Sequence, residues 1–188
     1  MHEKGTNGMK NGLGLFHAVT GDGKGKTTSA LGLAMRAVGQ GFRVIMIQFL
    51  KGEVDYGEHK AAPLLGGNFK IVRMGKGCLI RRGRLSDAEL REHREAAKKA
   101  LAFSRETLAS GGYDIVILDE IHCALDLALL DLDEVLELID GRPEGVELVF
   151  TGRYAPDEVL ARADLVSEIQ ARKHPYEQGI KARRGIEF

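Results

Sequence analysis

Residues 20–28 read Thr20-Gly21-Asp22-Gly23-Lys24-Gly25-Lys26-Thr27-Thr28 and lie between two different periodic patterns. The apolar stretch 13–19 before them predicts a strand, and 27–38 after them repeats apolar side chains at helical spacing. A helix N-terminus offers unpaired backbone N–H groups and positive potential, which suits a phosphate. A glycine-rich turn with Gly-Lys-Thr at a strand-to-helix junction therefore predicts a P-loop, the phosphate-binding loop of many nucleotide-binding proteins.

Each residue type in this loop has a physical role. Glycines allow the backbone to wrap an anion, Lys26 supplies a positive charge to the outer phosphates, and Thr27 can ligate Mg²⁺. The loop is a variant, because Thr20 stands where the usual pattern has a glycine. The alternative is a glycine-rich turn without a ligand, and the flanking strand and helix make it the poorer explanation.

Two further motifs follow predicted strands. Residues 114–118 are an apolar strand followed by Asp119 and Glu120. In a P-loop protein the acid at that point faces the metal held by the loop threonine, and the alternation of a strand gives the second acid a different task. Arg153 follows the strand 146–150, where it could reach a phosphate or be a solvated arginine in a turn. His174 is isolated, and we expect it on the surface.

The rest of the chain alternates strands with helices, which predicts an α/β fold with a mostly parallel sheet of about six strands and helices on both faces. Besides those above, the expected strands are 43–50, 70–74 and 165–169. A helix is expected over 86–110, where Ser86-Asp87-Ala88-Glu89 is a capping-box pattern. The acidic leucine-rich stretch after residue 118, in which Asp131 and Glu134 repeat the cap pattern, and 156–163 are also expected to be helical. We expect a flexible tail over 1–12 and a single P-loop domain over 13–188. The connection 52–68 is long and irregular, as functional loops often are.

Composition narrows the function classes. The 188 residues carry zero formal net charge and 44% hydrophobic residues, which is globular composition. No apolar run approaches the ~20 residues that a membrane span needs, the first residues contain no apolar signal region, and two cysteines cannot build a disulfide framework. Five basic and no acidic residues lie in 73–86, and nine acidic and no Lys or Arg residues in 113–141. We expect a cytoplasmic protein that binds neither membrane nor nucleic acid.

Several segments beyond the P-loop together resemble the ATP:corrinoid adenosyltransferases, the P-loop type of cob(I)alamin adenosyltransferase. The resemblance covers roughly residues 15–188, and Gln48-Phe49-Leu50-Lys51-Gly52 and the C-terminal pattern carry it most specifically. The matching segments are Thr20–Thr28, Ala34–Gly41, Ile47–Gly52, Leu118–Glu120, Thr151–Arg153, Lys173–Tyr176, Gly179–Ala182 and Gly185-Ile186.

The resemblance implies a P-loop NTPase fold of the RecA-like type and transfer of the 5′-deoxyadenosyl group of ATP to Co(I) of a reduced corrinoid, with release of triphosphate, in adenosylcobalamin biosynthesis. It implies Mg²⁺ or Mn²⁺, a flavodoxin-like reductase that delivers the electron, and a homodimer. Lys26 and Glu120 would be the catalytic residues. The metal would be held by Thr27, Asp119 and Glu120. ATP would be bound by Gly21, Asp22, Gly23, Lys24, Gly25, Lys26, Thr27, Thr28, Arg36, Gln48, Lys51 and Arg153.

One segment departs from the family pattern. Many members carry Gly-Phe-x-Trp after the third strand, where the aromatic side chains displace the lower cobalt ligand. Here the segment reads Gly77-Cys78-Leu79-Ile80, and the chain has no tryptophan. We expect Cys78, Leu79 and Ile80 to wall off the corrinoid with aliphatic surface instead.

Two other classes of function also fit the P-loop and the acidic pair. One is a nucleoside kinase or an ATPase that cleaves the γ-phosphate, although two cysteines cannot form the zinc-binding lasso of thymidine-kinase-type enzymes. The other is a regulatory sensor that binds ATP without catalysis. Release of triphosphate in the presence of reduced corrinoid distinguishes the adenosyltransferase from both.

Overall fold

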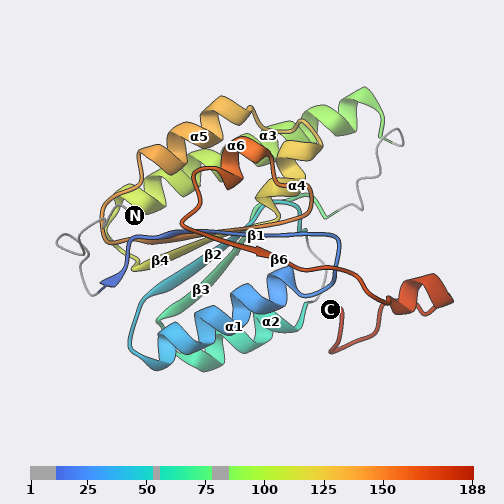
Figure 1. Ribbon diagram of the computed structural model, residues 1–188, viewed down its shortest axis with the longest axis horizontal. Coiled ribbons are helices and arrows are strands. Elements are labelled where there is room, and N and C mark those ends of the chain that lie inside the picture. Colours follow the sequence, from blue (N-terminus) through green and yellow to red (C-terminus); the bar gives the residue numbers. More distant parts are fainter. Residues whose placement is uncertain (1–11, 53–55, 78–84) are drawn as a thin grey trace.

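The computed structural model describes residues 12–52, 56–77 and 85–188, and six parallel strands form one sheet at its centre (Figure 1). The order across the sheet is β3-β2-β4-β5-β1-β6. The strands are β1 (Phe16–Thr20), β2 (Val44–Gln48), β3 (Phe69–Arg73), β4 (Ile115–Asp119), β5 (Glu147–Thr151) and β6 (Leu165–Glu168). Each strand expected from the sequence is present, with its ends shifted by a few residues.

Helices cover both faces of the sheet, as the sequence predicts. In Figure 1, α1 and α2 lie below the sheet, whereas α3, α4, α5 and α6 lie above it. The helices are α1 (Lys26–Gly39), α2 (Gly57–Ala61), α3 (Asp87–Ala109), α4 (Ile121–Asp126), α5 (Leu132–Asp140) and α6 (Asp157–Leu160), with short 3₁₀ helices η2 (Ala62–Leu65) and η3 (Pro175–Gln178). The expected α/β fold, a parallel sheet of six strands with helices on both faces, is confirmed. No helix among the described residues is both long and apolar enough to cross a membrane.

The strands are apolar throughout because their alternating side chains enter two different cores. Ile45 and Ile47 of β2 pack into the core under α3 and α5, and Val44 and Met46 pack into the core against α1. The same division holds for β4. Burial on both faces explains why these strands read as continuous apolar runs instead of alternating ones.

The start of α3 follows its sequence signal closely. Ser86 accepts a hydrogen bond from the Glu89 backbone N–H, and the Glu89 carboxylate accepts one from the Ser86 N–H at 2.8 Å. This reciprocal pair is the capping box that the sequence predicts. Ala97, Leu101 and Leu108 of the helix are buried in the core.

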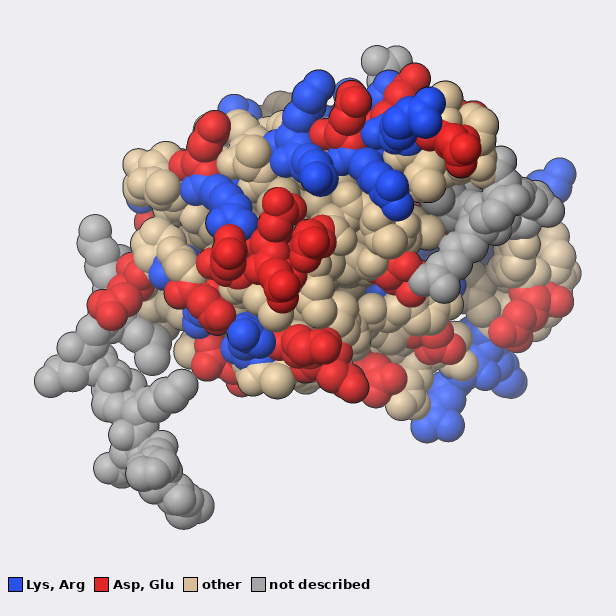
Figure 2. Space-filling model, turned by 90° about the horizontal axis from the view of Figure 1, so that it is seen from above, with Lys and Arg blue, Asp and Glu red and all other residues tan. Residues whose placement is uncertain are grey.

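The acidic leucine-rich stretch forms two helices, α4 and α5, and the second is capped at Asp131, where the sequence repeats the cap pattern. Ala128 between them has φ +53°, a left-handed conformation that no helix interior accommodates. Helix α6 is also shorter than the expected 156–163. Figure 2 shows acidic and basic side chains side by side on the face above the sheet, where Arg105 of α3 contacts Glu137 of α5 at 3.4 Å.

The order of strands brings the expected functional segments together. Strand β5 lies between β1 and β4, and all three run in the same direction. Their carboxyl ends are therefore neighbours, at Thr20, Asp119 and Thr151. Gln48 at the end of β2 pairs in register with Asp119. Ligands of open parallel sheets bind at this edge.

Candidate functional site

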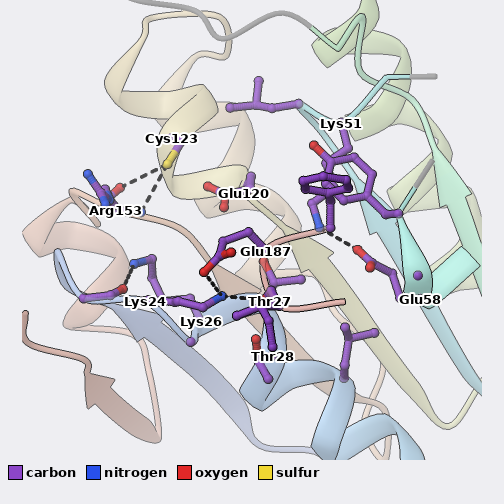
Figure 3. Close-up of a pocket in the computed structure, with 18 of the residues that line it drawn as sticks. Lys24, Lys26, Thr27, Thr28, Lys51, Glu58, Glu120, Cys123, Arg153 and Glu187 are labelled. Atoms are coloured by element: carbon purple, nitrogen blue, oxygen red, sulfur yellow. Dashed lines mark hydrogen bonds and ion pairs between the residues drawn. The ribbon is translucent and has the colours of Figure 1, made fainter. Parts of the chain in front are cut away.

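A large cavity opens beside the P-loop at the carboxyl edge of the sheet. Its volume is about 1040 Å³, ample for a nucleotide. Figure 3 shows it from within, with side chains arriving from the P-loop, β4, β5 and the end of the chain. Of the expected ATP-binding residues, those that line it are Gly23, Lys24, Gly25, Lys26, Thr27, Thr28, Lys51 and Arg153.

Lys26, the first residue of α1, is curled back over the P-loop. Its Nζ donates to the carbonyl oxygens of Gly21 at 2.8 Å and Gly23 at 2.6 Å. Burial lowers the pKa of this ammonium, and the positive charge of Arg153 lowers it further. The lysine is thus placed at the helix N-terminus, where backbone N–H groups also point toward an anion.

The first part of the loop is anchored to the chain after β6. A Cβ on Gly21 would come 2.4 Å from the Ile169 carbonyl oxygen, and one on Gly23 would come 2.8 Å from it. The Asp22 carboxylate accepts the Ala171 N–H at 3.0 Å. Gly21 and Asp22 do not line the cavity. The structure thus gives these glycines a packing reason that the sequence analysis did not foresee.

Asp119 is fully buried and lies directly beside Thr27. Its Oδ1 accepts hydrogen bonds from the Thr27 hydroxyl at 2.9 Å and the Thr151 hydroxyl at 2.7 Å. Its Oδ2 accepts one from the Gln48 side-chain amide at 3.1 Å and lies 3.5 Å from the Lys51 Nζ. Four donors therefore hold the carboxylate in one orientation.

Glu120, the next residue, faces the cavity. Its backbone has φ +65°, which is unusual for a residue with a side chain, and its N–H donates to the Thr151 hydroxyl oxygen at 3.0 Å. Burial and then the charge of Asp119 raise the pKa of its carboxyl. The same burial, together with Glu120, raises the pKa of the Cys123 thiol, which also lines the cavity.

Lys51 extends the site toward α2. Its Nζ contacts the Glu58 carboxylate at 2.8 Å and lies 4.7 Å from the centre of the Tyr56 ring. Burial alone would lower the pKa of Lys51, but the charges of Asp119 and Glu58 outweigh it and raise that pKa. Glu58 lines the cavity but was not expected there from any motif, although it lies in the long connection 52–68.

Gln48 and Arg36 lie away from the cavity. Gln48 is buried behind it, where its side chain connects Asp119 to His59, whose Nε2 lies 2.7 Å from the Gln48 Oε1. Arg36 is exposed near the end of α1, ten residues and ~15 Å along the helix from Lys26. The structure brings Gln48 to the site as a support for Asp119, and it does not bring Arg36 there.

Other residues line the cavity to which the sequence assigned no role in the site. Among them are Tyr154, His174, which we expected on the surface, and the segment 185–188. Tyr154 is 64% exposed and has φ +58°. Gly77 lines the cavity too, and the expected corrinoid-binding residues Cys78, Leu79 and Ile80 that follow it lie outside the described residues.

The site offers few metal ligands of its own, as is typical of sites where a cation is bound together with a nucleotide. Among the described residues, no group of three or more His, Cys, Asp or Glu side chains could hold a metal ion by itself. Thr27 and Asp119 offer one hydroxyl and one carboxylate 2.9 Å apart. Mg²⁺ is commonly bound by one or two protein ligands together with phosphates and water. These residues therefore fit Mg²⁺ carried by a triphosphate.

Comparisons with known proteins match nearly the whole chain to one family. The family described as ATP:corrinoid adenosyltransferase BtuR/CobO/CobP matches residues 12–188. The corrinoid adenosyltransferase of Escherichia coli K12 is 35% identical over 176 residues, which are 93% of this chain and 86% of that protein. The corrinoid adenosyltransferase of Pseudomonas aeruginosa is 35% identical over 181 residues, 95% of this chain and 85% of its own length.

Among solved structures, the flagellar accessory protein FlaH of Methanocaldococcus jannaschii aligns with 92% of this chain and 69% of its own. The TM-score is 0.43 and the sequence identity 11%. The family assignment therefore depends on the sequence matches alone.

Proposed function

Because the chain belongs to the ATP:corrinoid adenosyltransferase family, we propose that it transfers the 5′-deoxyadenosyl group of ATP to Co(I) of a reduced corrinoid and releases triphosphate. The observation that supports this most is the family match over residues 12–188 together with a P-loop whose Lys26 and Thr27 line a cavity. The cavity has room for more than the phosphates alone.

The reaction forms a carbon–cobalt bond at C5′ of the ribose and breaks the bond from C5′ to the triphosphate oxygen. The electron pair for the new bond comes from Co(I), and the triphosphate leaves with the electrons of the broken bond. No proton is abstracted, so the site needs no general base. Its task is to neutralise charge that accumulates on the leaving group.

We assign that task to the cations around the P-loop. Lys26 contacts the outer phosphates once its ammonium leaves the loop carbonyls, and the backbone N–H groups of the loop add to it. Mg²⁺, held by Thr27 and Asp119 with the phosphates, would supply further positive charge. Arg153 lines the same cavity, and we assign it to the phosphates from its position just after β5.

Glu120 has a different role in this proposal. Its carboxyl faces the cavity from a left-handed backbone conformation, and carboxylates are good acceptors for ribose hydroxyl groups. We assign it to the ribose or to the metal, where it would orient C5′ toward the cobalt. Lys51 forms ion pairs with the Glu58 and Asp119 carboxylates, and we assign it to holding these two side chains in position.

The products test this function directly. Chemically reduced corrinoid and MgATP should yield inorganic triphosphate and a light-sensitive cobalt–carbon product in equal amounts. Stoichiometric ADP would instead show a kinase or an ATPase, and nucleotide binding without turnover would show a sensor. The measurement is chromatography of the nucleotides together with the visible spectrum of the corrinoid.

The remaining proposals concern the corrinoid and its partners. We propose that Cys78, Leu79 and Ile80 provide an apolar wall that excludes the lower cobalt ligand, because each buried aliphatic side chain contributes ~1.5–3 kcal/mol. Ile80→Asp should then impair adenosylation from Co(II) much more than from pre-reduced Co(I), with ATP binding retained. Equal losses with both cobalt states would contradict this role.

We also propose a cytoplasmic homodimer, with residues 13–188 as one domain, that receives electrons from a flavodoxin-like reductase. Analytical ultracentrifugation tests the dimer. Replacing the chemical reductant with a reduced flavodoxin tests the electron donor, and activity only with the chemical reductant would contradict it.

A further inference from the structure

The turn 183–188 returns to the P-loop from the far end of the chain. Lys24 Nζ donates a hydrogen bond to the Ile186 carbonyl oxygen at 2.8 Å and lies 4.0 Å from the Glu187 Oε1. Figure 3 shows Glu187 beside the P-loop lysines.

The turn is closed by its own hydrogen bonds. The Gly185 N–H donates to the Phe188 carbonyl at 2.7 Å, and the Glu187 N–H donates to the Arg183 carbonyl at 2.9 Å. The Glu187 carboxylate accepts the Arg183 N–H at 2.7 Å and its guanidinium at 3.2 Å. The turn is thus a preformed unit that docks through Lys24.

The docked turn is also a wall of the nucleotide cavity. Its residues 185–188 line the same space as Lys26, Thr27, Glu120 and Arg153. A carboxylate beside a triphosphate would repel it, but the Glu187 carboxylate faces two cations, Arg183 and Lys24. A wall with its charge compensated would shield bound phosphates from water on its side, and loss of that water would strengthen their contacts with the cations.

We propose that Lys24 is a positioning residue that holds the 183–188 turn against the P-loop, and that the turn is the part of the nucleotide site that encloses the triphosphate. Lys24 then acts on nucleotide affinity through the turn and not as a phosphate ligand of its own. The inference rests on the proposed function, because it takes the cavity to be the ATP site.

Three variants separate these roles. Lys24→Met removes the ammonium that holds the turn. Gly185→Val strains the turn because Gly185 has φ +76°, a conformation that residues with a side chain rarely adopt. No atom lies within 4 Å of an added Cβ, so the strain comes from the backbone and not from a clash. Gly179→Val is the matched control, with φ +75°, the same open surroundings and no place in the cavity lining.

Calorimetry with MgATP and with inorganic triphosphate gives the affinities. We expect Lys24→Met and Gly185→Val each to weaken both by about fivefold, the scale of one charge-assisted contact near the surface. The double variant should be no weaker than the single ones, because both changes remove the same docked turn. The KM for ATP should rise while kcat at saturating ATP stays close to that of the wild type.

Hydrogen exchange of the backbone amides in 183–188 gives a readout independent of nucleotide. Lys24→Met should accelerate this exchange in the nucleotide-free protein, and triphosphate should slow it in the wild type. Gly179→Val should leave the affinities and the exchange of 183–188 unchanged.

Several results would overturn the proposal. Normal binding by Gly185→Val beside weak binding by Lys24→Met would make Lys24 a direct phosphate ligand. Tighter binding by both would make the turn a competitor of the triphosphate. Equal losses in Gly179→Val would show a general disturbance of the C-terminal segment. A wild-type protein that binds no MgATP would instead refute the proposed function.

Discussion

The Lys26 ammonium can change hydrogen-bond partners by rotation of its own flexible side chain. In the structure it donates to the carbonyl oxygens of Gly21 and Gly23. Moving it to a phosphate exchanges two neutral acceptors for a charged one, which makes the stronger contact. The N–H groups of Lys26 that donate to the loop carbonyls are therefore the same donors that would bind the nucleotide.

Lys26→Ala should lower ATP affinity or turnover by an order of magnitude or more, because a charge-assisted contact contributes ~1.5–3 kcal/mol. The fold should survive, since the side chain lies at the edge of the cavity and not in either core. Calorimetry and the adenosylation assay measure the loss. The control is Lys98→Ala on the exposed side of α3, and wild-type turnover in Lys26→Ala would contradict the P-loop assignment.

Thr151 connects the two acids of the site. Its hydroxyl donates to Asp119 Oδ1 and accepts the backbone N–H of Glu120, and the residue is fully buried. The sequence motif drew attention to Arg153, two residues later, but this contact depends on β5 lying next to β4. A threonine at a strand end carries no such signal in the sequence.

Thr151→Val keeps the shape and removes both hydrogen bonds. A buried donor left without its partner costs ~1–3 kcal/mol, so the free energy of unfolding should fall by about that amount. Turnover should fall as well, because Asp119 and Glu120 lose a shared support. Thr151→Ser retains the hydroxyl and should keep most of both quantities. Urea unfolding and the product assay decide, and a Val variant like the wild type would remove Thr151 from the site.

At the scale of elements, the agreement with the sequence follows from how local each signal is. The strand 114–118 and the helix that begins after Ser86 are specified by neighbours in the sequence, through apolar runs and a capping box. The start of α5 is specified locally as well, because Asp131 caps it and accepts the Asp133 N–H, whereas the left-handed conformation of Ala128 before it has no signal in the sequence. The docking of the 183–188 turn on Lys24 spans 162 residues, beyond any local pattern.

The same distinction holds for the candidate site. The P-loop and the acidic pair could be placed at one edge from the sequence, since parallel strands end together. Glu58 could not be placed at this edge from the sequence, because its position depends on the ion pair with Lys51, for which there is no sequence pattern. Arg36 occupies a position that matches the family, but it is exposed and does not line the cavity, although Met35 beside it does.

The first strand is tied to β5 by one buried acid. The Glu147 carboxylate accepts the N–H groups of Gly14 at 2.8 Å and Leu15 at 2.9 Å and lies 2.6 Å from the His17 Nε2. Burial alone would raise its pKa, but these hydrogen bonds, led by that of His17, outweigh it and lower the pKa below the ordinary 4.5. The folded protein therefore favours the charged carboxylate.

This lowered pKa predicts a pH-dependent loss of stability in Glu147→Gln. A depressed carboxyl pKa contributes stability that is present above the unfolded pKa of about 4.5 and is lost as pH falls through the lower folded value. The variant should thus be less stable than the wild type by ~1–3 kcal/mol at pH 7. The difference should shrink below pH 4.5. Urea unfolding across pH measures it, with exposed Glu144→Gln as the control, and a difference independent of pH would contradict the charge effect.

At the scale of the whole molecule, the site joins segments from both ends of the chain. The cavity lining runs from Gly23 to Phe188 and draws on the ends of β1, β2, β4 and β5. The two cores lie on opposite faces of one sheet, and these strands contribute to both. A ligand that contacts these segments together should therefore stabilise the whole sheet against unfolding.

MgATP should accordingly stabilise the global fold and not only the loop. A ligand that binds only the folded protein adds ~2.7 kcal/mol to the free energy of unfolding at a concentration of 100 times its Kd. Because we propose that Thr27 and Asp119 hold the metal, removal of Mg²⁺ by EDTA should abolish most of that gain, and Asp119→Asn should weaken its dependence on Mg²⁺. Thermal unfolding with MgATP, with ATP and EDTA, and with AMP measures this. Equal stabilisation with and without Mg²⁺ would exclude the metal from this pair of residues, whereas protection of amides in the P-loop alone would show that the nucleotide does not bridge the segments.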